Sequence, residues 1–215
     1  MMTLSLETSA FFREEYHTDP LVFLPRFDTE RLVEHIIALC PPDGVVADLC
    51  CGSGCVGIST MANSSTAHVY AVDINPHATE LTRKNAAFNK VQERHTTILS
   101  DIADTSWAEG LTFDVIASNP PYVRSSDMAT LPDECVLEPT IAFDGGADGM
   151  DFYRLILEKY RPFLTPSGRF VFEIGYHQAD DIRELAHTHG LKCAVHKDYG
   201  GNNRVAVIHN KENAT

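Results

Sequence analysis

The sequence predicts an α/β fold in which helices cover both faces of a mostly parallel, seven-stranded sheet. Short apolar segments with the composition of buried strands alternate with longer segments whose apolar residues recur at helical spacing, and this alternation is typical of α/β domains. The first of these strands, residues 45–49, runs into a glycine-rich turn and then a helix. That arrangement lets a backbone and a helix N-terminus approach a nucleotide closely.

The expected elements follow one another along the chain with short connections. The strands are expected at residues 45–49, 67–73, 96–99, 113–118, 169–174, 191–196 and 204–209. Helices are expected at residues 28–40, from the glycine turn to about 62, and at 76–90, 150–164 and 178–189, with a turn at 165–168. Asp28 is a candidate N-cap of the first helix, and Asn75-Pro76 supplies a cap and a first-turn proline for the third. Residues 1–20 are expected to form an arm or a short helix, and residues 21–215 a single domain.

Composition argues against several classes of protein. No run of about 18 apolar residues is present, so the sequence predicts no membrane span. The first 15 residues lack a basic region followed by an apolar block, so no secretory signal is expected and the predicted location is cytoplasmic. The net charge of -13 would repel phosphate backbones, which argues against a dedicated nucleic-acid binder.

The six cysteines are expected to be reduced thiols, because no secretory signal accompanies them. Three of them, Cys50, Cys51 and Cys55, lie close together in the sequence. They match no zinc-binding spacing and have no histidine nearby. We therefore interpret them as small packing residues and predict no metal site.

Two aspartates end the next two strands and are candidate ligand-binding residues. Asp73 follows Asp48 by 25 residues, and a carboxylate at that place can accept hydrogen bonds from both ribose hydroxyls of a nucleoside. A capping role is the alternative for Asp73, but Asn75 already supplies a cap. Asp101 ends the third strand, where it could hold an exocyclic amine; a solvated loop aspartate is an equally open interpretation.

The tetrapeptide Asn119-Pro120-Pro121-Tyr122 follows the fourth strand, at the edge where open α/β sheets bind ligands. Two prolines fix two φ angles and supply no N–H, so the nearby carbonyls stay free to accept hydrogen bonds. Asn119 adds a side-chain acceptor and Tyr122 a flat ring. The tetrapeptide is either a rigid acceptor cluster for a planar –NH2 group or a turn that ends the strand.

Together these features resemble the class I S-adenosylmethionine-dependent methyltransferases, whose fold is Rossmann-like. The tetrapeptide resembles the motif of those members that methylate planar amino nitrogens. The resemblance implies that S-adenosylmethionine is the cofactor. It also implies the cofactor-binding residues, which are Asp48, Cys50, Gly52, Gly54, Asp73, Asp101, Ile102 and Asn119.

Further segments resemble the HemK/PrmC family of release factor glutamine methyltransferases. They are residues 24–34, 138–153, 173–178 and 198–204, so that the resemblance covers about residues 21–210. The family methylates the side-chain amide nitrogen of a glutamine in peptide chain release factors, which implies a protein partner and a role in translation termination. Asn119, Pro120 and Tyr122 are then the expected catalytic residues. The same three residues, with Pro121 and Phe27, are expected to bind the substrate.

Two departures from the family pattern affect the expectations. The family's glycine turn usually reads Gly-x-Gly-x-Gly, whereas Cys50 and Cys51 occupy its first two places here. A cysteine costs energy where φ must be positive, and we expect the turn to adapt and still bind the cofactor. Bacterial members also carry a helical docking domain before the Pro-Arg segment, where this sequence has about 20 residues. The catalytic site is therefore expected to be complete, whereas the part that docks the release factor is expected to be incomplete.

Three functional interpretations remain open at this point. The first is a glutamine-amide methyltransferase that acts on a protein. The second is an amino-group methyltransferase that acts on a small molecule or a nucleobase. The third is a non-catalytic module that only binds S-adenosylmethionine.

Overall fold

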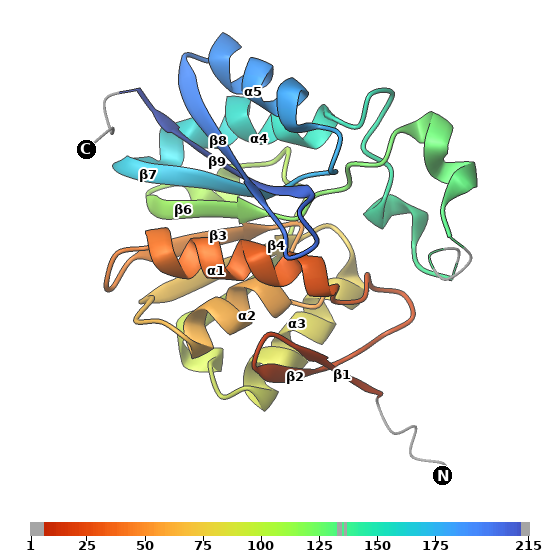
Figure 1. Cartoon of the computed structure of the whole chain (residues 1–215). Helices are drawn as coiled ribbons and strands as arrows, with labels where there is room; N and C mark the ends of the chain where they lie inside the picture. Colours follow the sequence, from red (N-terminus) through yellow and green to blue (C-terminus); the bar gives the residue numbers. More distant parts are fainter. Residues whose placement is uncertain (1–6, 133–134, 136, 212–215) are drawn as a thin grey trace.

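A seven-stranded sheet runs through the centre of the structure, a computed structural model that describes residues 7–132, 135 and 137–211 (Figure 1). The strand order across the sheet is β5-β4-β3-β6-β7-β9-β8. The strands are β3 (Val45–Leu49), β4 (His68–Asp73), β5 (His95–Leu99), β6 (Phe113–Ser118), β7 (Leu164–Glu173), β8 (Leu191–Lys197) and β9 (Asn203–Asn210). This is the predicted class I methyltransferase arrangement.

The sheet is parallel from β5 to β7, and β9 is antiparallel to both β7 and β8. The chain moves outward from β3 to β4 and β5, and then crosses back to β6 and β7. The strand order therefore reverses between β3 and β6, and ligands bind at such a reversal in open α/β sheets. Leu49 pairs with Ser118 at the carboxyl ends of these two strands. The glycine turn and the tetrapeptide consequently start side by side.

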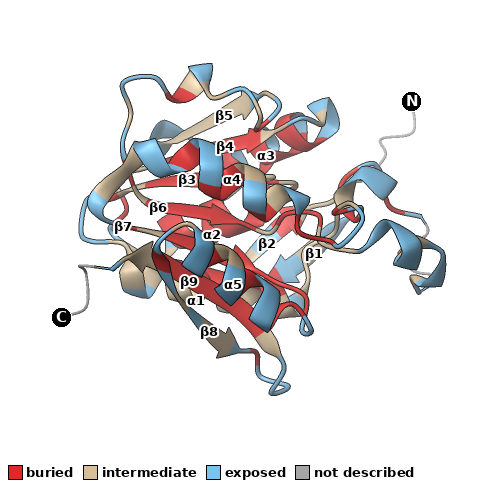
Figure 2. Cartoon of the chain, turned by 90° about the horizontal axis from the view of Figure 1, so that it is seen from above, coloured by how far each residue is buried: buried red, intermediate tan, exposed pale blue. Residues whose placement is uncertain are grey.

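Helices cover both faces of the sheet, as predicted. The helices α1 (Glu30–Leu39), α2 (Cys55–Ala62) and α3 (Pro76–Phe88) lie below it in Figure 1, and α4 (Asp151–Tyr160) and α5 (Ala179–Thr188) lie above it. Each face has its own cluster of buried apolar residues. The strands between them are largely buried, whereas the outer faces of α4 and α5 are exposed (Figure 2).

The described part of the N-terminal segment differs from the expected arm or helix. It contains a β-hairpin of β1 (Thr8–Phe11) and β2 (Glu14–His17), and residues 1–6 of the expected arm lie outside the described residues. Tyr16 is fully buried, and its hydroxyl lies 2.6 Å from the Ser59 hydroxyl of α2. The hairpin therefore packs against the helical layer, and its Phe11 and Tyr16 belong to the buried apolar cluster of that layer.

Two local predictions were wrong. Asp28 does not cap α1, which begins after a short 3-10 turn (Phe27–Thr29); its carboxylate instead lies 3.2 Å from the Arg204 guanidinium. The turn expected at residues 165–168 lies within β7, where the pairing with β6 shifts register. None of the helices formed by the described residues is long and apolar enough to span a bilayer.

Candidate active site

A cavity of about 810 Å³ opens at the carboxyl ends of the central strands. It brings together most of the residues that the sequence predicted. The predicted residues in its wall are Asp48, Cys50, Gly52, Asp73, Asp101, Ile102, Asn119, Pro120, Pro121 and Tyr122. Gly54 and Phe27 are not among the residues that line it. The cofactor turn and the tetrapeptide therefore face one common space.

The glycine turn keeps its left-handed backbone even where cysteine replaces glycine. Cys50 has a φ of 58°, Gly52 of 56° and Gly54 of 79°. A Cβ on Gly54 would lie 2.7 Å from Thr82, whereas a Cβ on Gly52 would meet no atom within 4 Å. Cys50 therefore adopts a conformation that is strained for a side chain, and the open space at Gly52 leaves room for a ligand against the backbone.

Helix α3 and the start of α2 hold the turn in place. The Thr82 hydroxyl donates to the Gly52 carbonyl at 2.9 Å, and the Asn85 amide donates to the Ser53 carbonyl at 3.0 Å. The Asp48 carboxylate accepts a 3.0 Å hydrogen bond from the Gly57 N–H at the start of α2. Burial raises the pKa of Asp48 to about 7. Asp48 is therefore a structural brace of the turn, although it also borders the cavity.

Asp73 is oriented by two backbone groups. The Gly52 N–H donates to one carboxylate oxygen and the Asn75 N–H to the other, each at 2.9 Å. Asn75 caps α3 by accepting from the His77 N–H at 3.0 Å, as predicted. Asp73 is not the cap and it lines the cavity, so its carboxylate can still accept hydrogen bonds from a ligand there. A carboxylate held in this way can accept hydrogen bonds from the two hydroxyls of a diol, as predicted for the ribose.

The far end of the cavity combines apolar and polar groups. Ile102 is buried and Ile74 is half exposed, and both line the cavity. Asp101 is exposed, and its carboxylate accepts a 2.8 Å hydrogen bond from the Ala103 N–H. Apolar side chains beside a carboxylate suit a flat, amine-bearing ring such as adenine. With the Gly52 space and the Asp73 carboxylate, these residues fit S-adenosylmethionine.

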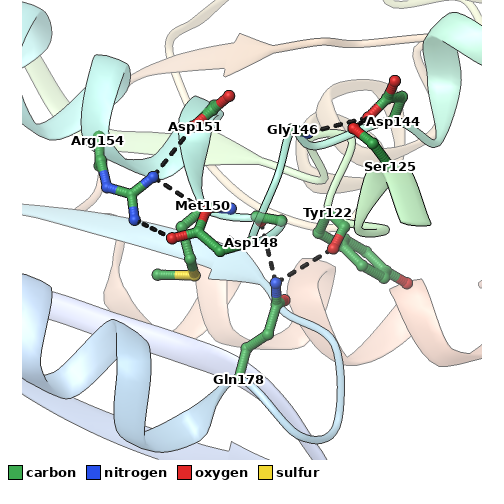
Figure 3. A network of polar contacts seen from close by, with 10 residues as sticks. Tyr122, Ser125, Asp144, Gly146, Asp148, Met150, Asp151, Arg154 and Gln178 are labelled. Carbon is green, nitrogen blue, oxygen red and sulfur yellow. Dashed lines mark hydrogen bonds and ion pairs between the residues drawn. The ribbon is translucent and has the colours of Figure 1, made fainter. Parts of the chain in front are cut away.

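Two features hold the backbone of the tetrapeptide in place: Gln178, which directly precedes α5, and the glycine loop before α4 (Figure 3). The Gln178 amide donates to the carbonyls of Tyr122 and Gly149, at 3.2 Å and 3.0 Å. A Cβ on Gly149 would lie 2.4 Å from the Tyr122 carbonyl oxygen, and a Cβ on Gly145 would lie 2.7 Å from that of Pro121. Only glycine permits this close approach, which explains why the loop carries glycine at both positions.

The polar side chains of the tetrapeptide are held from the protein side. The Asn119 amide nitrogen donates to the Thr29 hydroxyl at 3.3 Å, and the Tyr122 hydroxyl donates to the Glu173 carboxylate at 3.2 Å. Among the described residues, no donor reaches the Asn119 side-chain oxygen or the Pro120 carbonyl. These two oxygens are therefore available as acceptors beside the cavity.

A second wall joins two segments that are far apart in the sequence. The buried Glu138 carboxylate forms an ion pair with Arg26 and accepts a 2.9 Å hydrogen bond from the Leu24 N–H. The rings of Phe23 and Phe143 meet edge to face at 5.5 Å. The Pro-Arg and Glu-Pro segments of the sequence thus close one side of the cavity together.

Phe27 lies outside this wall. Its side chain is 64% exposed, and its ring lies 5.6 Å from that of Tyr199. Residue Arg204, which lines the cavity, also lies 3.3 Å from the buried Asp198. The role of Phe27 in binding substrate stays a prediction.

Sequence reasoning did not identify several residues that shape the site. Thr29, Thr82, Asn85 and Glu173 are buried polar residues whose partners lie on other elements. Thr82 and Asn85 lie three positions apart on α3 and therefore share one face of that helix. Two polar residues on a buried face could have indicated that they bind a neighbouring segment. Of the three clustered cysteines, Cys51 and Cys55 are buried, as expected for packing residues, whereas Cys50 is half-buried; all three line the cavity. No group of three potential metal ligands is present within the described residues.

The strand order, the left-handed turn and the oriented Asp73 define a class I S-adenosylmethionine-dependent methyltransferase. The family model "Methyltransferase small domain" matches residues 24–136, more than half of the chain. The release factor glutamine methyltransferase of Aquifex aeolicus is 35% identical over 86% of this chain and 66% of its own length. That of Geobacter sulfurreducens is 35% identical over 93% of this chain and 70% of its own length. The chain belongs to the release factor glutamine methyltransferase family.

The solved structures support the fold alone. Ribosomal protein L11 methylase from Lactobacillus delbrueckii subsp. bulgaricus is similar with a TM-score of 0.64 at 20% identity. The similarity covers 89% of this chain and 82% of that one. At this identity the likeness concerns the methyltransferase fold and not the methyl acceptor.

Proposed function

We propose that the protein transfers a methyl group from S-adenosylmethionine to the side-chain amide nitrogen of a glutamine in a peptide chain release factor. The observation that carries this proposal is the pair of unoccupied acceptors, the Asn119 side-chain oxygen and the Pro120 carbonyl, beside a cavity that fits the cofactor. Two N–H hydrogens of a primary amide match two fixed acceptors. The names of the curated relatives support the choice of glutamine and of a release factor.

An amide nitrogen is a poor nucleophile because its lone pair is delocalised into the carbonyl. The two acceptors hold both N–H hydrogens, which aims the nitrogen and stabilises the positive charge that builds on it. The sulfonium cofactor supplies an activated methyl group when it is bound. Transfer would form an N–C bond at the amide, break the S–C bond of the cofactor and release one amide proton to water, because the two neutral acceptor oxygens cannot keep it. The protein contributes alignment above all.

Tyr122 does not serve as a base in this scheme. Its hydroxyl donates to Glu173 rather than facing an acceptor in the cavity. Burial, together with the neighbouring negative charge of Glu173, raises the pKa of this hydroxyl well above its usual range. Tyr122 therefore stays neutral, and its ring offers a flat surface to the substrate amide.

The rim of the cavity supports a protein substrate. Large apolar side chains stand exposed there, with Tyr176 64% and Ile141 54% exposed. Exposed apolar side chains at the mouth of a cavity suit contact with a polypeptide segment. The chain's net charge of -13 argues against a nucleic-acid substrate. We also propose a cytoplasmic location, since all six cysteines are free thiols.

A methyl-transfer assay tests the proposal. The protein is incubated with radiolabelled S-adenosylmethionine and either a purified release factor or total RNA, and cofactor binding is measured by calorimetry. We expect label in the release factor alone. Label in RNA would replace this proposal with a nucleobase methyltransferase, and cofactor binding without transfer would favour a non-catalytic module.

The Asn119→Ala variant tests the acceptor pair within the same assay. Removal of one fixed acceptor should lower turnover by about 100- to 1000-fold, the range seen when one charge-stabilising hydrogen bond is lost at an active site. The cofactor dissociation constant should change far less. Retained turnover would show that the amide is not held by this pair.

A further inference from the structure

One face of α3 carries polar residues that contact two different parts of the fold. Thr82, Asn85 and Asn89 share this face because they lie three and four positions apart, with Asn89 at the end of the helix. Thr82 and Asn85 are fully buried. At one end of the face, the Thr82 hydroxyl donates to the Gly52 carbonyl of the glycine turn. At the other end, the Asn89 amide donates to the Glu15 carbonyl of the β-hairpin at 3.0 Å.

Asn85, between these two residues, joins the hairpin to the glycine turn through its side-chain amide. Its oxygen accepts a 2.8 Å hydrogen bond from the N–H of His17, the last residue of β2. Its nitrogen donates to the His17 carbonyl at 3.2 Å and to the Ser53 carbonyl at 3.0 Å. All three partners are backbone groups, whose roles as donor or acceptor cannot change. The orientation of the amide is therefore set by the backbone on both sides.

The hairpin also reaches the end of the glycine turn through Tyr16. Its buried hydroxyl lies 3.3 Å from the carbonyl of Cys55, the first residue of α2. Beside it, the Glu14 carboxylate accepts a 2.7 Å hydrogen bond from the Ser59 hydroxyl of α2. Ser53 and Cys55 both line the cavity. The hairpin is therefore linked to two backbone carbonyls in the cavity wall, one of them through Asn85.

The glycine turn needs such support more than a turn made only of glycine would. Cys50 has a φ of 58°, a conformation that is unfavourable for a residue with a Cβ. A strained conformation persists only where the surrounding structure determines it. The Ser53 carbonyl belongs to the peptide group that ends at Gly54, and the Gly54 N–H donates to the Cys51 carbonyl at 2.8 Å. Asn85 therefore holds a peptide group that is itself bonded back to the turn.

We propose that Asn85 is a positioning residue for the cofactor, and that it makes the affinity for S-adenosylmethionine depend on the docked N-terminal hairpin. With the hairpin docked, the turn keeps the conformation that leaves the space at Gly52 open and directs the Gly52 N–H to Asp73. Without this link the turn samples other conformations, and the apparent affinity falls with the fraction of molecules that can bind. This coupling is independent of the group that accepts the methyl.

Four substitutions separate the coupling from a general loss of packing. Asn85→Ala removes the link itself, whereas Asn89→Ala removes only a hydrogen bond between the same helix and the hairpin. His17→Pro removes the N–H that Asn85 accepts, and His17→Ala keeps that N–H but removes the ring contact with Phe88. Because the His17 N–H points to α3, proline there leaves the pairing of β1 and β2 intact.

Calorimetric titration of each purified protein with S-adenosylmethionine measures the coupling, after thermal unfolding has established that the protein is folded at the titration temperature. We expect Asn85→Ala to raise the cofactor dissociation constant about tenfold and His17→Pro about fivefold, with His17→Ala and Asn89→Ala within about twofold of the wild type. If Asn85→Ala does not fold, the two variants of His17 decide. Equal losses in Asn85→Ala and Asn89→Ala, or an unchanged affinity in His17→Pro, would overturn the proposal.

Steady-state kinetics with a purified release factor give a second readout. The KM for S-adenosylmethionine should rise in Asn85→Ala and His17→Pro, while kcat at saturating cofactor should stay within about twofold of the wild type, because the tetrapeptide is not altered. A fall in kcat with an unchanged KM would contradict a role in cofactor positioning.

Hydrogen exchange of the cofactor-free proteins requires neither cofactor nor methyl acceptor. The Gly52 N–H donates to Asp73 and the Gly54 N–H to Cys51, so their exchange with solvent reports how often the turn opens. We expect faster exchange in Asn85→Ala and His17→Pro than in the wild type and the two controls. Faster exchange and weaker cofactor binding without methylation of the release factor would support the positioning role and refute the proposed acceptor. Equal exchange in all five proteins would refute the positioning role.

Discussion

The conformation of Cys50 leads to a stability prediction with an unusual sign. Replacing glycine by alanine normally stabilises a protein by about 0.4–1 kcal/mol where the backbone permits it, because the unfolded chain loses freedom. Cys50 has a φ of 58°, and a left-handed conformation costs a residue with a Cβ about 1–2 kcal/mol. The cost of the left-handed conformation is larger than the gain from the reduced freedom of the unfolded chain. We therefore expect Cys50→Gly to be more stable than Cys50→Ala by about 1 kcal/mol.

Urea unfolding of the two variants, followed by circular dichroism, measures this difference. The comparison removes the sulfur atom from both proteins, so that only the Cβ atom differs. Cys193 in β8 is the matched control, because it is a strand residue without a positive φ. There the alanine variant should be the more stable of the pair. The reasoning would be refuted if alanine were the more stable choice at both positions.

Four further outcomes are expected. Gly52→Ala should lower stability by about 1–2 kcal/mol from its φ alone, and Gly54→Ala by at least about 1 kcal/mol more because its Cβ would also meet neighbouring atoms; equal losses on urea unfolding would contradict this. Asp73→Asn should weaken cofactor binding by about tenfold or more, the effect of losing charge-assisted hydrogen bonds, and an unchanged calorimetric titration would argue against its role. Glu138→Ala should cost about 1 kcal/mol by leaving the half-buried Leu24 N–H and Arg26 guanidinium without their partner, which thermal unfolding would detect. The pKa of His95 is lowered by burial to about 4 from its ordinary 6.5, so the unfolded chain binds more protons at this residue between these values, and its contribution should lower stability by about 2 kcal/mol from pH 7 to pH 5. Because the pKa of Asp48, about 7, and that of His35, about 4, affect stability over the same pH range, the test is the difference from His95→Gln: the wild type should lose about 2 kcal/mol relative to that variant, and an unchanged difference would contradict this.

The parts of the fold that depend on neighbours in sequence were predictable. The strand at residues 113–118 matches β6 at both ends, because an apolar run and the following prolines define it locally. The Asn75 cap was likewise predictable from two adjacent residues. The cavity then followed from the rule that the strand ends at a reversal of strand order bind ligands.

The features that escaped prediction depend on partners far along the chain. Asp28 was expected to cap a helix, but its partner is Arg204 on the last strand. Thr29 and Glu173 contact the tetrapeptide only because folding brings residues far apart in the sequence together. The hairpin was missed because its two strands are only four residues each, too short to show a periodic pattern.

The most direct test of the central claim is to locate the transferred methyl group by tandem mass spectrometry. A purified release factor is incubated with the protein and S-adenosylmethionine, digested and sequenced by fragmentation. The account predicts one added methyl group on the side-chain amide of a single glutamine, and at least about 100-fold slower methylation of the same residue when Asn119→Ala replaces the wild-type enzyme. A methyl group on a lysine, an arginine or the N-terminus, or an unmodified release factor, would contradict it.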